Sequence, residues 1–279
     1  MDFEDDRAER DAEAAAEAVS SRLRIGAALT GVAALLLAWS TSLSLWDVIG
    51  LSLYYVLLPA LALAQLPLLR TERLERIPVY LGSALTILTI GVIGLLLGLR
   101  QVGPEALGLV GMEWERMLVW TLGLTGAGIL IIVAFIPMER AMGQGGARIL
   151  ADLLPRTPGE KRAFVGLSAS AGLGEELAYR GYALVAVQLL GPGPWLAAAV
   201  SSVAFGFLHV YQGTIGVVRT GVMGFVLAVP VVLTGSILPS IVAHTLIDLI
   251  AGLVLGPQLS RAMGGVEETP ALVPPPTKE

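Results

Sequence analysis

Several ionisable residues in the second half of this chain lie inside stretches that are otherwise apolar. Glu175, Glu176 and Arg180 fall near the middle of the apolar stretch 163–190, which is long enough to cross a membrane. One charge at the centre of such a helix costs about 2.5–3.5 kcal/mol on insertion scales, so these groups normally pair, face a bundle interior or line a functional cavity. This stretch is therefore the first place to look for chemistry.

The spacing of these three residues separates the two carboxylates. Glu176 and Arg180 are four residues apart, so they share one helical face and can neutralise each other. Glu175 is rotated by about 100° from its neighbour, so it can point into a cavity and act as a general base. The structural alternative is a buried ion pair with a spare acid that only stabilises helix packing.

The only two histidines of the chain also lie in apolar stretches of the second half. His209 ends a Phe-Gly-Phe-Leu-His run that starts at Phe205, and His244 is followed four residues later by Asp248. On a helix this carboxylate can set the tautomer of the imidazole or share a ligand with it. Either histidine alone would be read as a satisfied core residue, but together with Glu175 they indicate a site.

The composition predicts an all-α polytopic membrane protein. Of the 279 residues, 55% are hydrophobic and 15% are charged, whereas about 25% are charged in a typical soluble domain. The absence of cysteine excludes disulfides, thiolate metal sites and a cysteine nucleophile. Nothing in the charge pattern indicates a nucleic-acid surface.

Runs of about 17–25 apolar residues predict a bundle of about eight transmembrane helices. The expected spans are 25–42, 48–69, 78–99, 118–138, 163–190, 195–210, 215–233 and 237–255. Around them we expect an acidic N-terminal tail (1–24), either solvated or a short amphipathic helix, four front helices (25–138) and a cytoplasmic or interfacial loop (139–162). A core of four helices (163–255) and a disordered tail (256–279) that is rich in proline complete the predicted organisation.

The distribution of basic residues predicts the orientation. The expected tails and loops on the N-terminal side of the membrane hold 14 of the 18 Lys and Arg residues, and the opposite side holds only Arg100 and Arg116. Short cytoplasmic loops are enriched in Lys and Arg, so we expect both termini to be cytoplasmic. Arg219 lies inside a predicted span near the cytoplasmic end, where it can extend to the interface, and the sequence assigns it no role.

These motifs resemble those of the CPBP family of intramembrane proteases, the CAAX prenyl protease and bacteriocin-processing proteins that are also called Abi. The family is marked by Glu-Glu-x-x-x-Arg, by Phe-x-x-x-His and by His-x-x-x-Asn or Asp. The matching residues here are Glu175, Glu176 and Arg180, then Phe205 and His209, then His244 and Asp248. The resemblance covers about residues 163–255, and the front spans match only in being hydrophobic.

The resemblance implies a catalytic arrangement within the bundle. Glu175 and His209 would activate a water for attack on a peptide carbonyl, and His244 and Asp248 would hold the developing oxyanion. Glu176, Arg180 and Phe205 would support them. The prenyl-protein proteases of this group have Asn at the last position, so an aspartate at 248 must be protonated, orient His244 or bind a metal.

The cofactor question stays open at this stage. The family has been described both as metal-dependent and as metal-free. Glu175, His209 and His244 would suit a catalytic zinc, which takes three protein ligands and keeps one position open. A glutamate that binds the metal could not also be the free base, so the residues slightly favour metal-free activation.

The leading hypothesis is an endopeptidase that acts on a membrane-associated protein or peptide, with a lipidated C-terminal segment as one candidate substrate. Its partners would be this substrate and the lipid bilayer. A proton-coupled transporter is one alternative, but it predicts internal repeats and polar residues in both halves, and neither is visible. A non-proteolytic scaffold of the same fold predicts the loss of a motif residue, and none is lost.

Overall fold

The computed structural model describes residues 2–41, 43–67, 75–142 and 150–258. The described part of the chain is helical and contains no strand, which confirms the predicted all-α class. The front half consists of α1 (Asp2–Ser40), α2 (Leu45–Ser52), the π-helical segment η1 (Leu53–Leu57), α3 (Leu58–Gln65), α5 (Arg76–Gln101) and α6 (Trp114–Met142).

The back half begins with a rod in which α8 (Pro158–Glu175) continues into the π-helical segment η2 (Glu176–Ala183) and then into α9 (Leu184–Gln188). A capping box starts this rod, because Thr157 and Glu160 exchange side-chain and backbone hydrogen bonds. The remaining elements are α10 (Pro194–Leu208), the short 3₁₀ turn η3 (Val210–Gln212), α11 (Gly213–Thr234), α12 (Leu238–Ile250) and η4 (Ala251–Leu255).

Each of the eight predicted spans is largely helical in its described residues. Within the residues that the structure describes, six helices are long and apolar enough to cross a membrane: Ala16–Trp39, Leu45–Gln65, Arg76–Gln101, Trp114–Met142, Val210–Thr234 and Leu238–Gln258. The other two predicted spans are the rod from α8 to α9, whose centre carries charges, and α10, which has only 15 residues. The polytopic class therefore stands, and the number of crossings stays a prediction.

The ends of the chain differ in part from the expected organisation. The predicted tail 1–24 and the first predicted span form one continuous helix, α1, in the described residues. Between the halves, α6 continues to Met142, and the predicted loop 139–162 is described only outside 143–149. Helical residues continue to Gln258, and the rest of the predicted disordered tail, 259–279, lies outside the described residues.

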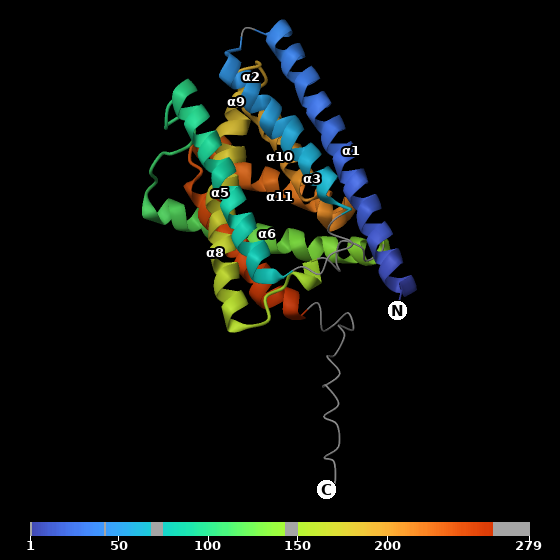
Figure 1. Cartoon of the computed structure of the whole chain (residues 1–279). Helices are drawn as coiled ribbons and strands as arrows, with labels where there is room; N and C mark the ends of the chain where they lie inside the picture. Colours follow the sequence, from blue (N-terminus) through green and yellow to red (C-terminus); the bar gives the residue numbers. More distant parts are fainter. Residues whose placement is uncertain (1, 42, 68–74, 143–149, 259–279) are drawn as a thin grey trace.

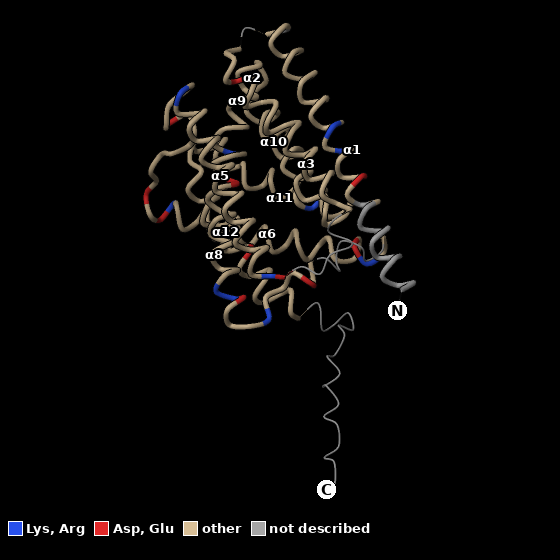
Figure 2. Tube along the Cα trace, viewed as in Figure 1, with Lys and Arg blue, Asp and Glu red and all other residues tan. Residues whose placement is uncertain are grey.

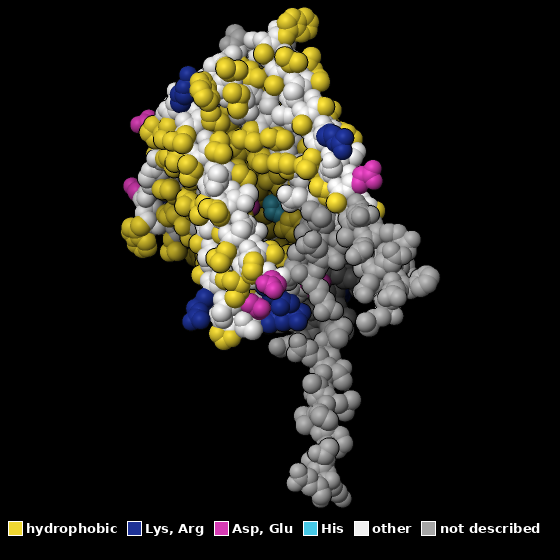
Figure 3. All heavy atoms as spheres, viewed as in Figure 1, with side chains coloured by type: hydrophobic (Ala, Val, Ile, Leu, Met, Phe, Trp, Pro, Cys, Tyr) yellow, Lys and Arg dark blue, Asp and Glu magenta, His cyan; other side chains and the backbone are white. Residues whose placement is uncertain are grey.

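The outer surface of the bundle is apolar. In Figure 3 hydrophobic side chains cover the visible faces of the helices, and Figure 2 shows Lys, Arg, Asp and Glu gathered mainly at the helix ends. Large apolar side chains are widely exposed, among them Trp39 at 86% and Leu35 at 72%. Apolar patches of this extent are rare on soluble monomers, so this surface fits a lipid environment.

Small residues let α5 lie directly against the charged rod. A Cβ at Gly91 would come within 2.7 Å of the backbone of Gly174 in α8, so only glycine fits at this contact. A Cβ at Gly94 would lie 2.8 Å from the Tyr54 hydroxyl oxygen and 3.3 Å from the Cα of Ala178 in η2. Close backbone approach through small residues is the usual mode of helix packing in membranes, and here it fixes the height of η2 in the bundle.

The two π-helical segments η1 and η2 contact each other at the core. The Tyr54 ring meets the Tyr179 ring edge-on at 5.8 Å and the Tyr182 ring at 5.4 Å. The Tyr55 hydroxyl donates to the carbonyl of Ala183 at 2.9 Å. The front half therefore packs its tyrosines directly behind the charged segment.

Candidate active site

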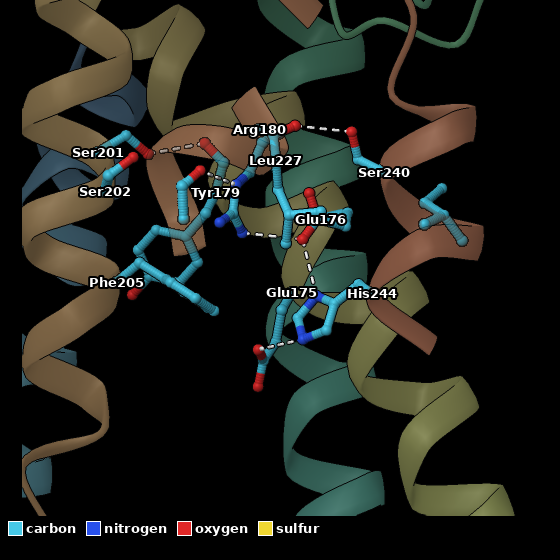
Figure 4. A network of polar contacts seen from close by, with 12 residues as sticks. Glu175, Glu176, Tyr179, Arg180, Ser201, Ser202, Phe205, Leu227, Ser240 and His244 are labelled. Atoms are coloured by element: carbon cyan, nitrogen blue, oxygen red, sulfur yellow. Dashed lines mark hydrogen bonds and ion pairs between the residues drawn. The ribbon is translucent and has the colours of Figure 1, made fainter. Parts of the chain in front are cut away.

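Glu176 lies at the centre of a buried polar cluster formed by η2, α10, α11 and α12 (Figure 4). Its Oε1 accepts a hydrogen bond from Arg180 Nη1 at 2.9 Å, so the structure contains the ion pair that the i, i+4 spacing predicts. The same oxygen lies 2.8 Å from His244 Nδ1, a contact that the sequence did not predict. Both members of the ion pair are almost fully buried, and their charges compensate each other there.

Arg180 is held from three sides. Its Nε donates to the carbonyl of Gly224 at 3.3 Å, and its guanidinium carbon lies 4.3 Å from the centre of the Phe205 ring. A Cβ at Gly224 would come within 2.9 Å of Nη2 and 3.0 Å of the Phe205 ring, so glycine here leaves room for the guanidinium against α11. Phe205 therefore supports the cluster as a cation–π partner and as the wall beside the cation.

Glu175 points away from this ion pair, as its helical offset predicts. Its Oε2 lies 3.7 Å from His244 Nε2, and its side chain is 14% exposed. Asp248 Oδ2 approaches the same histidine nitrogen at 3.9 Å, with a side chain that is 35% exposed. His244 thus stands between a buried carboxylate at Nδ1 and two more accessible carboxylates near Nε2.

His209 stands on the other side of Phe205 from His244. It caps the C-terminus of α10, and its Nδ1 lies 3.1 Å from the carbonyl of Phe205. The Phe205 ring is 4.9 Å from the His209 ring and 6.2 Å from the His244 ring. No hydrogen bond joins His209 to Glu175 among the described residues, so any joint action of these two side chains would pass through a bound molecule such as water.

Hydroxyl groups from other helices stabilise the π-helical backbone of η2. Ser201 donates to the carbonyl of Tyr179 at 2.8 Å from α10, and Tyr55 donates to that of Ala183 from η1. Within the described part, Glu176 Oε2 and Arg180 Nη2 are buried without a protein partner. Sequence reasoning did not find Ser201 or Tyr55, because their only signal was a polar group in an apolar helix.

The proposed zinc ligands do not form a metal site in this structure. Among the described residues there is no group of three or more His, Cys, Asp or Glu side chains that could hold a metal ion. His244 has one nitrogen on Glu176 and the other facing two acids, and His209 lies across Phe205 from it. Glu175, His209 and His244 therefore do not fit a zinc site as they stand.

Comparison with known families gives one finding. Residues 160–250, about a third of the chain, match the family model described as type II CAAX prenyl endopeptidase Rce1-like. No curated protein and no solved structure matches the chain. The matched segment contains every motif residue of the cluster, and it confirms the resemblance to the CPBP proteases over that segment.

The fold, the cluster and the match together support the class of CAAX-type intramembrane proteases. The multiple apolar helices support an integral membrane protein, and the matched family is described as an endopeptidase.

Proposed function

We propose that this protein is an intramembrane endopeptidase in which Glu175 activates a water molecule. The observation that carries the proposal is that the neighbouring carboxylates of Glu175 and Glu176 have different surroundings. Arg180 and His244 occupy the Oε1 atom of Glu176, whereas Glu175 has no guanidinium partner among the described residues and stays partly accessible. A general base needs such an accessible carboxylate within reach of water.

In the proposed reaction, Glu175 takes a proton from water while the water oxygen bonds to the carbonyl carbon of the scissile peptide. The carbonyl oxygen becomes an oxyanion in the tetrahedral intermediate. The C–N bond then breaks, and the proton held by Glu175 passes to the leaving amine. The products are a new carboxylic acid and a new amine, with no further reactant.

His209 is proposed as the second group on the attacking water. A backbone carbonyl can only accept, so the contact with Phe205 places the proton of a neutral His209 on Nδ1. Its Nε2 is then an acceptor for a proton of the water or of the substrate.

For His244, the contact with Glu176 likewise favours a proton on Nδ1. Asp248, at 3.9 Å from Nε2, is proposed to orient His244 and to balance its charge when both nitrogens are protonated. Asp248 could instead be protonated or bind a metal, but the short distance between its carboxylate and the His244 ring supports the orienting role.

The substrate class is proposed from the matched family. A lipid-anchored C-terminal peptide would enter from the bilayer through the apolar surface. We accordingly choose a farnesylated peptide that ends in Cys-aliphatic-aliphatic-X as the first test substrate, alongside membrane-embedded peptides without a lipid. The basic-residue pattern supports a site that opens toward the cytoplasm.

The test compares the reconstituted parent with Glu175→Gln, Glu175→Ala and His209→Ala, and with Glu105→Gln as a control acid that is exposed and belongs to none of the motifs. We expect cleavage to fall by about 10²–10⁴-fold in the Glu175 variants and to stay at the parent level in the control. Equal cleavage by the parent and Glu175→Gln would refute the role of Glu175. A chelator titration of the parent tests metal dependence independently.

A scaffold of the same fold is the second candidate, because it needs only the buried ion pair and not the accessible acid. It predicts no cleavage of either substrate class by any variant.

A further inference from the structure

A chain of polar side chains runs from α6 to the turn that follows His209. Arg219 of α11 forms an ion pair through Nη1 with Glu139 of α6, and its Nη2 donates to Gln212 Oε1 at 2.6 Å. Gln212 Nε2 then donates to the Tyr211 hydroxyl oxygen at 3.1 Å. Sequence reasoning expected Arg219 only to extend to the interface, so this chain is a finding of the structure.

The donors and acceptors fix the direction of this chain. A guanidinium can only donate, so Arg219 holds the amide of Gln212 with its oxygen inward and its NH₂ toward Tyr211. The Tyr211 oxygen therefore accepts a hydrogen bond, and its own O–H remains a donor. No acceptor for this O–H is found in the part of the chain that the structure describes.

Tyr211 lies beside the catalytic cluster. Its ring is 6.0 Å from the His209 ring and tilted by 34° to it, and the side chain is partly exposed. The Tyr211 hydroxyl is thus carried on a ring that packs beside His209, the residue proposed to contact the attacking water.

The backbone of the turn makes room for this arrangement. Gly213 follows η3 with φ of +81°, a conformation that side chains other than glycine rarely adopt. A Cβ at Gly216 would come within 2.3 Å of Gln212 Cβ, so glycine there lets Gln212 lie against α11. The turn is thus built to place Gln212 between Arg219 and Tyr211.

The proposed reaction needs a donor that the motif residues supply poorly. Peptide hydrolysis develops a negative charge on the carbonyl oxygen, and donors aimed at that oxygen are a major source of catalysis. His244 has its Nδ1 on Glu176 and can donate only through Nε2, which already faces the carboxylates of Glu175 and Asp248. The Asp248 carboxylate would itself repel an oxyanion unless it were protonated. A neutral hydroxyl could donate a hydrogen bond to the oxyanion whether Asp248 is charged or protonated.

We propose that Tyr211 is a further catalytic residue, whose O–H donates to the substrate carbonyl oxygen as it becomes an oxyanion, with its direction set by Gln212 and Arg219. This inference rests on the proposed endopeptidase function. It assigns Gln212, Arg219 and Glu139 to positioning, because they act only through Tyr211.

The first experiment removes the hydroxyl alone. Tyr211→Phe in the full reconstituted chain is expected to lower kcat by about 10²–10³-fold and to change KM by less than about 3-fold, because the interaction forms only in the transition state. Tyr80→Phe, which removes a tyrosine hydroxyl far from the motifs, serves as the control, and thermal unfolding in detergent confirms that both variants fold. A kcat close to that of the parent, or a loss confined to KM, would overturn the proposal.

The second experiment keeps the hydroxyl but turns it around. In Gln212→Glu the new carboxylate accepts from both Arg219 and the Tyr211 O–H, so the donor no longer faces the substrate. We expect this variant to lose about as much kcat as Tyr211→Phe, with no further loss in the double variant. Gln212→Met, which cannot capture the O–H, should retain at least about 10-fold more activity than Gln212→Glu; equal losses would contradict the proposed direction of the chain.

The third experiment measures binding without turnover. A peptide aldehyde, whose hydrate mimics the tetrahedral intermediate, is compared with the matching peptide alcohol. Tyr211→Phe should weaken the binding of the aldehyde alone, by about the factor lost in kcat. Equal weakening of aldehyde and alcohol binding would argue against an oxyanion donor. If Glu175→Gln is inactive and Tyr211→Phe cleaves like the parent, only this inference fails; if both cleave like the parent, the proposed role of Glu175 fails as well; and if the parent cleaves neither substrate class, the endopeptidase function itself fails.

Discussion

The two π-helical segments have the same backbone form and opposite chemical character. Both η1 and η2 interrupt rods that are otherwise α-helical, and they pack against each other. In η2 the buried polar groups are the charges of Glu176 and Arg180, whereas η1 contributes only the hydroxyls of Tyr54 and Tyr55. Of these two segments, η2 therefore contributes charged groups to the cluster, and η1 contributes only neutral groups behind them.

This difference assigns a structural role to the front half of the molecule. The Tyr55 hydroxyl reaches across to the backbone of η2, and the Tyr54 hydroxyl donates to the carbonyl of Ile90 in α5 at 2.5 Å. A π-helical turn is rare and occurs frequently at functional sites, where neighbouring groups must complete its hydrogen bonds. The front helices thus hold η2 in shape without carrying charge into the site.

The largest effect is expected from breaking the charge balance of η2. Arg180→Ala leaves Glu176 buried without its cation, and removing one partner of a buried ion pair typically costs about 3–5 kcal/mol. We expect the unfolding temperature of the purified protein to fall sharply and cleavage to be lost. As the matched control, Glu176→Gln combined with Arg180→Met should regain stability but not activity, because His244 loses its carboxylate. A fully active Arg180→Ala variant would show that the pair is not needed.

The second-largest effect is expected from the contact between α5 and the rod formed by α8, η2 and α9. Gly91→Ala forces a methyl group against the backbone of Gly174, and overpacking of this kind costs about 1–3 kcal/mol. Gly82→Ala on the same helix meets open space and should be neutral or slightly stabilising. Equal unfolding temperatures for the two variants would mean that α5 does not fix the position of η2.

Local regularities explain why much of this arrangement was predictable. Apolar runs predicted every helical span, and i, i+4 spacing predicted that Glu176 faces Arg180. The same spacing put Asp248 near His244, and the helical offset of Glu175 predicted its separation from the ion pair. Each of these inferences needs only the period of one helix.

Contacts between different helices could not be predicted from the period of a single helix. Glu176 meets His244 across 68 residues of sequence, and this contact depends on how η2 and α12 pack. Hydropathy does not distinguish a π-helical turn from an α-helical one, so η1 and η2 were not foreseen. For the same reason the roles of Tyr55 and Ser201 became visible only when their acceptors in η2 were located.

A smaller effect is expected from η1, if it supports the site only through neutral hydrogen bonds. Tyr55→Phe removes the donor to Ala183 and should cost about 0.5–1.5 kcal/mol, with cleavage reduced less than by any change in η2. Ser201→Ala removes the donor to the carbonyl of Tyr179 and should behave alike. If Tyr55→Phe abolished cleavage while unfolding like the parent, η1 would have a direct role in the chemistry.

The smallest effect should come from the start of the charged rod, outside both π-helical segments. The backbone N–H groups of Thr157 and Arg156 hold the pKa of the Glu160 carboxyl below its usual range. A lowered pKa in the folded state means that this group stabilises the helix start above its unfolded pKa, and that the stabilisation is lost as the pH falls through the folded value. Amide hydrogen exchange in the first turn of α8 should therefore accelerate relative to the rest of the helix as the solution is acidified. Glu160→Gln, which carries no titratable group, should remove this dependence and leave cleavage unchanged at neutral pH. A loss of cleavage in Glu160→Gln would show that the site is sensitive to the whole rod and not to η2 alone.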